Sequence, residues 1–227
     1  MSLKRKPPAG NVRRTICLGN NFRGVTTNKR GHLVQFESEQ ERKLILLLER
    51  DPSVTDYVSQ PETLFFKDEK GCSRRYTPDF QVWRAQGTIE LHEVTIESRR
   101  EGRASLHDRE AAAKRICQER GWNYIIHTDE TLPIGYEYAN LDFLSAFRPL
   151  VYDNSQMADW WVERLKGQTA SHPGTLVSTA EMGLETGALL NNLYHLLWYG
   201  VIAMPWRQPF FWRGDFHPQA CIWLPEE

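Results

Sequence analysis

Residues 76–96 read YTPDFQVWRAQGTIELHEVTI, and this stretch decides the fold. Two runs rich in β-branched and aromatic residues, Tyr76–Trp83 and Thr88–Ile96, flank the turn residues Ala85-Gln86-Gly87. Strand-forming residues on both sides of such a turn are typical of two antiparallel strands. The stretch therefore predicts a β-hairpin, and the neighbouring segments can be placed around it.

Those neighbouring segments predict an α/β unit. In chain order they are a helix that begins at Ser38 and ends before Asp51-Pro52, strands over Thr55–Val58 and Thr63–Phe66, the hairpin, a helix that begins at Ser105 and ends at Gly121, and a strand over Asn123–His127. Ser38 and Ser105 are typical N-caps, and Gly121 is a typical helix stop. A hairpin flanked by helices and followed by a further strand indicates an α/β domain of about 100 residues.

The C-terminal part has a different pattern. Helices are predicted over Asp142–Leu150, Ser155–Leu165, Ser178–Met182 and Thr186–Trp198, and short strands over Val201–Met204, Phe210–Trp212 and Cys221–Leu224. Helix, turn, helix and then a β-hairpin is the order of a winged helix, although an irregular aromatic cap would also fit. We therefore expect a basic N-terminal arm over residues 1–35, an α/β domain over 36–135 and a winged-helix-like interaction domain over 136–227.

Three acidic residues in the α/β unit could share a divalent cation. Asp79 and Glu93 lie on the two strands of the hairpin, where they can point to the same face, and Glu41 lies on the preceding helix. Carboxylate oxygens are hard ligands that suit Mg²⁺ or Mn²⁺. Such an ion activates water and stabilises the charge that develops on a phosphate, so this order of acids predicts phosphodiester hydrolysis.

Each acid also has a purely structural interpretation. Ser38 and Glu41 form the Ser-x-x-Glu pattern of a capping box, which is the favoured interpretation of Glu41 taken alone. Asp79 follows a proline, as turn acids often do, and Glu93 could face solvent on its strand. The three acids in this order favour the metal site more strongly than any one of them.

The segments that flank these acids resemble a known family. They are Phe36–Arg42, Asp51-Pro52-Ser53-Val54, Gln60-Pro61, Arg75–Phe80, Glu93-Val94 and Thr128-Asp129. Over roughly residues 20–130 the chain resembles the TnsA-type endonuclease subunits of heteromeric cut-and-paste transposases, within the PD-(D/E)xK superfamily. The resemblance implies an α/β restriction-endonuclease-like core with a C-terminal winged-helix-like domain.

The resemblance also assigns roles to residues. Glu41, Asp79 and Glu93 match the catalytic and metal-binding positions of the family. We expect Val94 to be a further metal ligand. We expect Gln60, Tyr76 and Thr95 to contact the ligands and hold them in position. In the family this domain cuts the 5′ ends of the transposon beside an integrase-like transposase that cuts the 3′ ends, and the C-terminal domain engages an ATPase regulator.

One position departs from the family pattern. The pattern expects Lys two residues after Glu93, where this sequence has Thr95. That lysine would orient the attacking water and stabilise negative charge, and Thr cannot do so as a cation. Three explanations stay open: the charge comes from Lys114, Arg99 or Arg100, two metal ions make it unnecessary, or the site is impaired and the chain is a scaffold. Lys114 is our candidate catalytic cation, although an exposed helix cation is the favoured interpretation.

The formal net charge of −1 conceals an uneven distribution. Residues 1–36 carry eight Lys or Arg and no Asp or Glu, so the remaining 191 residues carry 20 basic and 29 acidic side chains. A basic arm can contact nucleic-acid phosphates, although a solvated tail has the same composition. The residues expected to bind DNA are Lys4, Arg5, Lys6, Arg13, Arg14, Arg23, Arg74 and Arg75.

The C-terminal part favours a protein partner over DNA. The helix predicted in the recognition position, Thr186 to Tyr199, contains no Lys or Arg, whereas a helix that enters a DNA groove normally brings cations. Six of the eight Trp residues follow residue 150. They indicate a large aromatic core, and a docking surface is the alternative because aromatic residues are enriched at interface hot spots.

The composition excludes several classes of protein. With 41% hydrophobic and 25% charged residues, the chain is neither collagen-like nor wholly disordered. The four Cys residues are far apart, which favours reduced thiols. No apolar core follows the basic N-terminus, and the longest apolar run, Leu196–Trp206, is 11 residues. We therefore expect a cytoplasmic bacterial protein with no signal peptide or membrane partner, at the nucleoid when bound to DNA.

Together these expectations describe a DNA endonuclease subunit of a transposase. It would use Mg²⁺ or Mn²⁺ to direct water onto a phosphodiester, leaving a 3′ hydroxyl and a 5′ phosphate. The expected partners are double-stranded DNA at transposon ends, an integrase-like transposase subunit and an ATPase regulator subunit. Two alternatives stay open: a catalytically impaired assembly subunit of the same complex, and a stand-alone restriction or repair nuclease of the same fold.

Overall fold

The computed structural model describes residues 22–68, 70–101, 104–178 and 185–226. The chain divides into two units, one up to Leu132 and one from Pro133 onward, and each is described by itself. None of the described helices has the length and apolar character needed to cross a membrane.

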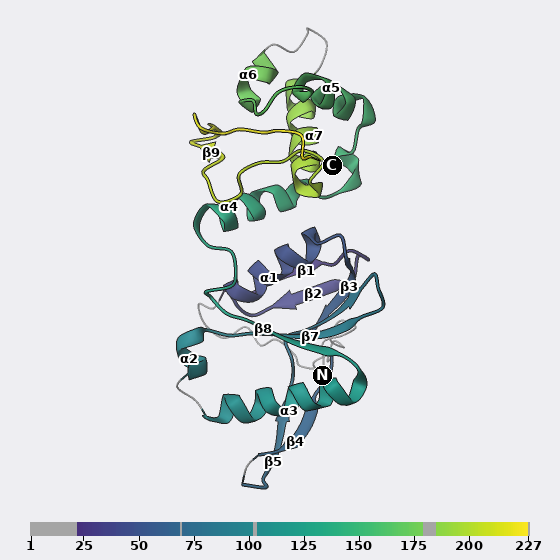
Figure 1. Ribbon diagram of the computed structural model, residues 1–227, viewed down its shortest axis with the longest axis vertical. Helices are drawn as coiled ribbons and strands as arrows, with labels where there is room; N and C mark the ends of the chain where they lie inside the picture. The colour runs from purple at the N-terminus through teal and green to yellow at the C-terminus, as the bar shows by residue number, and fades with distance from the viewer. Residues whose placement is uncertain (1–21, 69, 102–103, 179–184, 227) are drawn as a thin grey trace, which may run out of the picture. The chain divides into compact units, whose positions relative to one another are not determined.

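A four-stranded sheet forms the centre of the first unit (Figure 1). Its strands stand in the order β3 (Val54–Ser59), β6 (Phe80–Arg84), β7 (Ile89–Val94) and β8 (Asn123–His127). β7 and β8 are parallel, and the other pairs are antiparallel. The predicted hairpin is confirmed as β6 and β7, and Gly87 has the positive φ of +83° that its tight turn requires.

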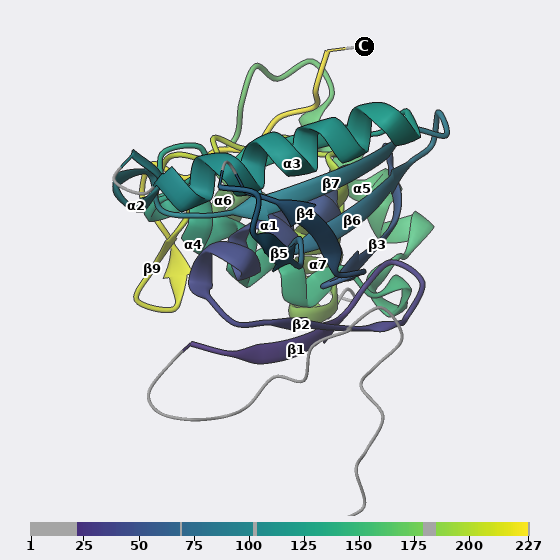
Figure 2. The same ribbon diagram turned by 90° about the horizontal axis from the view of Figure 1, so that it is seen from below.

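Helices cover the two faces of this sheet (Figures 1 and 2). Alternate strand residues point to opposite faces. The core on one side joins β6 to α1 (Glu39–Arg50), and includes Leu44, Ile45, Leu48, Tyr57, Phe80 and Val82. The core on the other side joins β7 to α3 (Ala104–Arg120), and includes Leu91, Ala113 and Cys117. The small Ala113 and Cys117 side chains let α3 lie close to the sheet.

The start of α1 and the end of α3 are as the sequence predicts. Ser38 is the N-cap of α1, and its hydroxyl accepts from the amide of Glu41. Gly121 follows the last residue of α3 with a φ of +69°, a left-handed conformation that favours glycine. A short helix, α2 (Glu97–Glu101), lies between β7 and α3.

The strand expected over Tyr76–Trp83 is wrong in its extent. The structure breaks it at Thr77-Pro78-Asp79 into β5 (Ser73–Tyr76) and β6. Pro78 has no N–H to donate to a sheet, so a continuous strand through it is unfavourable. β5 pairs instead with β4 (Leu64–Lys67) in a separate hairpin. The polar sequence of β5, Ser-Arg-Arg-Tyr, carries no strand pattern, which is why no strand is expected there from the sequence.

Part of the expected N-terminal arm forms a second small hairpin, β1 (Gly24–Thr27) with β2 (Leu33–Phe36). Its turn is fixed to the first unit. The side-chain amide of Asn28 donates to Asp56 Oδ1 at 2.7 Å and to the carbonyl of Tyr57 at 2.8 Å. This end of the arm is therefore part of the α/β unit.

The second unit is mostly helical. Its elements are α4 (Gly135–Leu144), two 3-10 turns η1 (Ser145–Phe147) and η2 (Leu150–Tyr152), α5 (Ser155–Leu165), α6 (Pro173–Ser178), α7 (Thr186–Tyr199), and the strands β9 (Phe211–Trp212) and β10 (Asp215–Phe216). Helix α7 is central: α4, α5, η1 and η2 all contact it. Trp161 and Trp198 are fully buried, as expected of an aromatic core, whereas Trp212 is 54% exposed.

The details of this unit differ from the prediction. The helix expected to begin at Asp142 begins at Gly135, and most of the helix expected over Ser178–Met182 lies outside the described residues. The expected strands Val201–Met204 and Cys221–Leu224 are reduced to isolated bridges, Ala203 with Trp223 and Ser171 with Ile222. The only paired strands described in this unit, β9 and β10, are two residues each, so the winged helix stays a prediction.

Candidate active site

Asp79 and Glu93 face one another across the β6–β7 hairpin. Phe80 pairs with His92, so Asp79, immediately before β6, stands opposite Glu93. The charge of Glu93 acts on Asp79 directly and raises the pKa of the Asp79 carboxyl. The backbone holds Asp79 from two sides: the amide of Val94 donates to Asp79 Oδ2 at 2.8 Å, and the amide of Gln60 donates to the Asp79 carbonyl at 2.8 Å.

Glu41 lies at the start of α1 and forms the capping box that its sequence pattern indicates. Glu41 Oε1 accepts from the hydroxyl of Ser38 at 2.9 Å, and Oε2 accepts from the amide of Glu37 at 2.9 Å. In return the Glu41 amide donates to Ser38 Oγ at 3.1 Å. Both carboxylate oxygens of Glu41 are therefore engaged at the helix start.

The three acids nevertheless act on one another electrostatically. Burial, and then the charge of Asp79, raise the pKa of Glu41 from its ordinary 4.5 to about 7. Burial and the charge of Glu93 raise the pKa of Asp79 well above its ordinary value. Burial raises the pKa of Glu93 as well, against the opposing effect of Arg109. Buried acids that repel one another form an environment that a cation would stabilise.

Arg109 of α3 brings a cation into contact with Glu93, and it is absent from the residues that the sequence pattern indicates. Its Nη2 donates to Glu93 Oε1, and its guanidinium lies 4.7 Å from the centre of the Tyr76 ring. Its Nε is buried and has no hydrogen-bond partner among the described residues. The signal that could have found it is helical spacing: Arg109 stands three and four residues before Ala112 and Ala113, on the buried face of α3.

Two tyrosines complete the surroundings of Glu93. The Tyr76 hydroxyl donates to Glu93 Oε2, and it lies 3.2 Å from the hydroxyl of Tyr124 on β8. Burial and the charge of Glu93 raise the pKa of Tyr76 well above its ordinary value, so this hydroxyl stays a donor. The Tyr76 hydroxyl thus contacts the Glu93 carboxylate, and the Gln60 amide contacts the backbone of Asp79.

The other candidate cations lie elsewhere. Lys114 is exposed on α3 and lines a surface pocket of about 440 Å³ with Trp122 and Tyr124. Arg100 pairs with Glu97 and Glu110. Thr95 follows β7, where its amide donates to the carbonyl of His127 at 2.9 Å. Lys114 as the replacement for the missing lysine therefore stays a prediction, whereas Arg109 of the same helix contacts Glu93.

The three acids have the ligand atoms that a divalent cation prefers, but they are not arranged closely enough to hold one together. Asp79, Glu93 and Glu41 offer only carboxylate oxygens, which Mg²⁺ and Mn²⁺ prefer. In the part of the chain that the structure describes, however, no three His, Cys, Asp or Glu side chains gather closely enough to hold a metal ion. Asp79 and Glu93 are paired, whereas Glu41 is bound to its own helix start. A metal ion held by all three would require their carboxylates to come closer together than the structure has them.

Only some of the residues expected to bind DNA are among the described residues. Lys4, Arg5, Lys6, Arg13 and Arg14 lie outside the described residues, and Arg23 is half-buried. Arg74 donates from Nε to Asp68 Oδ2 at 2.8 Å. Arg75 is exposed.

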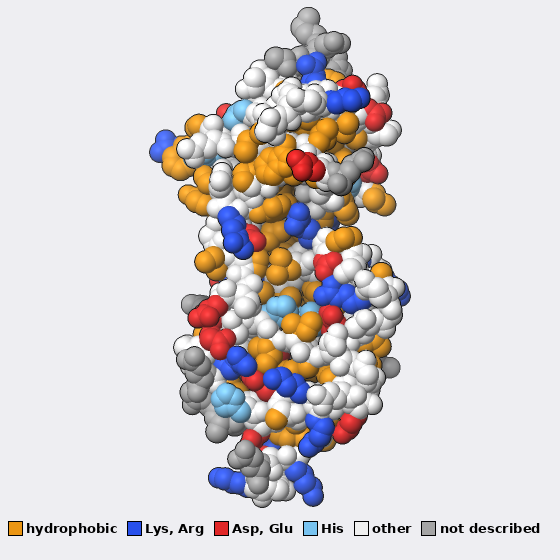
Figure 3. Space-filling view, viewed as in Figure 1, with side chains coloured by type: hydrophobic (Ala, Val, Ile, Leu, Met, Phe, Trp, Pro, Cys, Tyr) orange, Lys and Arg blue, Asp and Glu red, His pale blue; other side chains and the backbone are white. Residues whose placement is uncertain are grey.

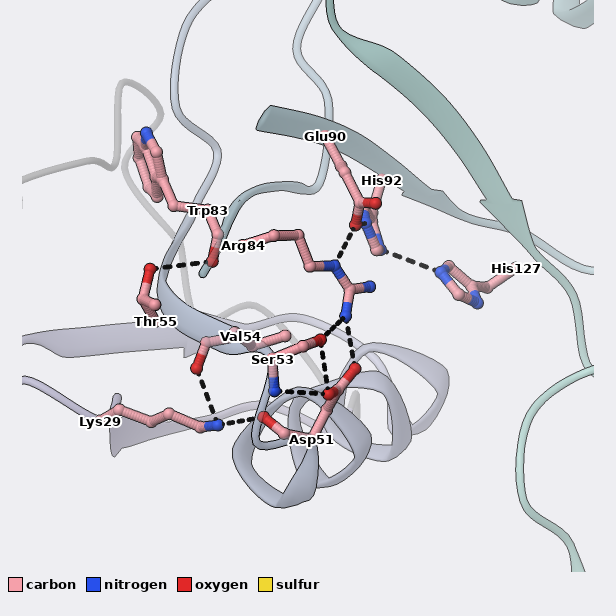
Figure 4. A network of polar contacts seen from close by, with 10 residues as sticks. All are labelled: Lys29, Asp51, Ser53, Val54, Thr55, Trp83, Arg84, Glu90, His92 and His127. Carbon is pink, nitrogen blue, oxygen red and sulfur yellow. Dashed lines mark hydrogen bonds and ion pairs between the residues drawn. The ribbon is translucent and has the colours of Figure 1, made fainter. Parts of the chain in front are cut away.

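A second polar network includes Glu90 and His92 of the same strand β7 (Figure 4). His127 Nε2 lies 3.0 Å from His92 Nδ1, and His92 Nε2 lies 2.9 Å from Glu90 Oε2. Arg84 donates to Glu90 Oε2 at 2.9 Å and also pairs with Asp51 at the end of α1. This chain of contacts ties the β6–β7 hairpin to α1 and β8.

His127 makes the stability of this network depend on pH. Burial, and then the neighbouring His92, lower the pKa of His127 to about 4 in the folded chain. An unfolded His titrates near about 6.5, so between these values the unfolded chain binds more protons and acidification favours unfolding. Between pH 7 and pH 5 this effect costs about 2 kcal/mol of unfolding free energy.

The measurement is denaturant unfolding of the wild type and His127→Gln across this pH range. Glutamine keeps a hydrogen-bonding side chain but does not titrate, so its curve should fall less steeply toward pH 5. The raised pKa of Glu41 affects both proteins alike and cancels in the comparison. Parallel curves for the two proteins would contradict the prediction.

The part of the chain that carries Asp79 and Glu93 is similar to a known protein family. Residues 51–129 match the family described as TnsA-like endonuclease N terminal. The match includes Asp79, Glu93 and Arg109, and α1 with Glu41 lies before it. No curated protein matches the chain. The resemblance to TnsA-type endonuclease subunits is thereby confirmed over residues 51–129, which lie within a unit of mixed α/β structure.

Proposed function

We propose that this chain is a metal-dependent DNA endonuclease subunit of a transposase, which cuts at the 5′ ends of the transposon beside an integrase-like partner subunit. The observation that carries the proposal is the facing pair Asp79 and Glu93 inside the TnsA-like domain, with Arg109 bonded to Glu93. Paired carboxylates beside a cation supply the groups that phosphodiester hydrolysis needs.

The chain's own residues would divide the work of the site. Asp79 and Glu93 would hold Mg²⁺ or Mn²⁺, with Glu41 and the backbone at Val94 as further ligands. The bound ion would supply an activated water and neutralise charge developing on the phosphate. The Val94 and Gln60 amides keep Asp79 oriented, and the Tyr76 hydroxyl fixes one oxygen of Glu93.

Arg109 would provide the positive charge that Thr95 does not. Its Nη2 orients Glu93, and its buried Nε has a hydrogen atom without an acceptor among the described residues. The family's lysine function would therefore come from α3 rather than from β7.

The helical second unit would contact a protein, with the ATPase regulator as its expected partner. Its longest described helix, α7, carries no Lys or Arg, and half of its residues are buried. A winged-helix-like role in DNA recognition would need cations on an exposed helix face. The absence of Lys and Arg from α7 favours the protein-binding role.

The test is strand cleavage in the reconstituted transposition complex. With Mg²⁺, a duplex carrying the transposon end should be cut at its 5′ end, and chelation with EDTA should abolish this cut until Mg²⁺ is restored. Cleavage that survives chelation would contradict the metal-dependent mechanism. Cutting by the purified chain alone with Mn²⁺ would instead indicate a stand-alone nuclease.

A second candidate function is that of an assembly subunit without catalysis. It is favoured by Thr95 at the lysine position and by the engagement of both Glu41 oxygens in the capping box. A complex that cuts the 3′ ends but never the 5′ ends, yet fails to assemble without this chain, would establish this role and overturn the nuclease.

A further inference from the structure

The β4–β5 hairpin extends away from the central sheet at one end of the first unit (Figure 1). Its strands pair Leu64 with Tyr76, Phe65 with Arg75 and Lys67 with Ser73. Leu64 and Tyr76 are buried in the α3 core, so this hairpin is fixed at its base. β5 leads through Thr77-Pro78 directly to Asp79, and the hairpin therefore stands beside the candidate active site.

The two faces of the hairpin differ. Because side chains alternate along a strand, Arg74 and Phe66 share the face of Leu64 and Tyr76. On this face Phe66 packs against the α3 core, and Arg74 is paired with Asp68.

The opposite face carries Phe65, Lys67, Arg75 and the small Ser73. Phe65 is 76% exposed, and Lys67 and Arg75 are exposed. Arg75 has no acidic partner among the described residues. Figure 3 shows Lys and Arg side chains at the end of the molecule where Figure 1 places this hairpin.

We infer that this face, formed by Phe65, Lys67 and Arg75, binds the backbone of double-stranded DNA next to the cleavage site. An aromatic ring flanked by two cations suits a nucleic acid, because cations bind phosphates and an aromatic face packs on a sugar or base. Same-face neighbours on paired strands lie about 5–8 Å apart, within reach of one stretch of backbone. A β-hairpin is also narrow enough to enter a DNA groove.

The inference separates two adjacent arginines. Arg75 points to the proposed DNA face, whereas Arg74 points to the other face and is held by Asp68. Of the two residues in this hairpin that the sequence assigns to DNA, the structure favours Arg75. The inference rests on the proposed DNA substrate, but binding can be measured without cleavage.

The experiment measures affinity of the full chain for a fluorescent duplex, with Ca²⁺ in place of Mg²⁺, over a series of salt concentrations. Arg75→Ala should weaken binding about 5- to 10-fold and lower the slope of log K against log salt by about 1, because one phosphate contact is lost. Phe65→Ala should weaken binding with an unchanged slope. Arg74→Ala is the matched control and should change affinity less than about 2-fold.

The outcomes distinguish this inference from the proposed function. Equal effects of Arg74→Ala and Arg75→Ala, or no effect of Arg75→Ala, would overturn it. Unchanged DNA binding with impaired assembly onto the partner transposase would assign this face to a protein and also overturn it. If the complex never cuts DNA but Arg75→Ala, unlike Arg74→Ala, weakens binding and lowers the salt slope, the inference stands and the nuclease proposal fails. Circular dichroism should confirm that each variant folds.

Discussion

Asp79→Asn is expected to reduce DNA cleavage on the order of 100-fold or more while the fold stays intact. Asparagine has nearly the same shape as aspartate. Its carbonyl oxygen can still accept from the Val94 amide, and its NH₂ group can donate to Glu93. Only the negative charge is lost, and that charge is what a divalent cation at this site would require.

The same substitution should make the protein more stable. Asp79 is held near Glu93 and Glu41, and the three acids raise one another's pKa values. Removing one of them relieves the repulsion, so the denaturant midpoint of Asp79→Asn should be equal to or above that of the wild type. Loss of cleavage together with gained stability is a combination that a misfolded variant cannot produce.

The control is Asp159→Asn, which removes an exposed acid from α5 in the other unit. It should leave both 5′-end cleavage and the denaturant midpoint unchanged. If Asp79→Asn cleaves as well as the wild type in the reconstituted complex, the facing acids are not the catalytic site and the nuclease proposal fails.

Much of the first unit could be predicted because its signals are local. Ser38 caps α1, Gly87 turns the β6–β7 hairpin and Gly121 ends α3, and each of these depends on residues within a few positions. The hairpin alone was sufficient to place Asp79 opposite Glu93. The capping box of Glu41 is equally local, and the structure contains it.

The features that could not be predicted depend on tertiary contacts. β5 is stabilised by pairing with β4 and by burial of Tyr76 at one end. The sequence Ser-Arg-Arg-Tyr has no alternation of apolar and polar residues that would indicate a strand. Arg109 stands 16 residues after Glu93 and reaches it only because α3 packs against the sheet. The sequence pattern named Lys114, Arg99 and Arg100 as substitutes for the missing lysine, and which cation of α3 reaches Glu93 depends on how that helix packs on the sheet.

Arg109→Ala is expected to reduce cleavage by about 100-fold, since it removes the cation that contacts Glu93. It also leaves Glu93 buried without its charged partner, which by itself would lower stability. Activity of this single variant therefore cannot separate a positioning role in cleavage from a structural one. Arg109→Lys supplies the first distinction, because it restores the charge without the planar guanidinium and should recover part of the activity.

Thr95→Lys supplies the decisive comparison. In the wild type the added lysine should change cleavage little, because Arg109 already provides the positive charge. In the Arg109→Ala background the same substitution should raise cleavage about 10-fold or more, since the new ammonium group would stand at the position where the family pattern expects a cation. A gain in cleavage in the Arg109→Ala background only would show that positions 95 and 109 are coupled. A purely structural role for Arg109 would not produce that coupling. If Thr95→Lys gives the same gain in both backgrounds, Arg109 does not replace the lysine; if it rescues neither, the site lacks more than a cation and the assembly role is favoured.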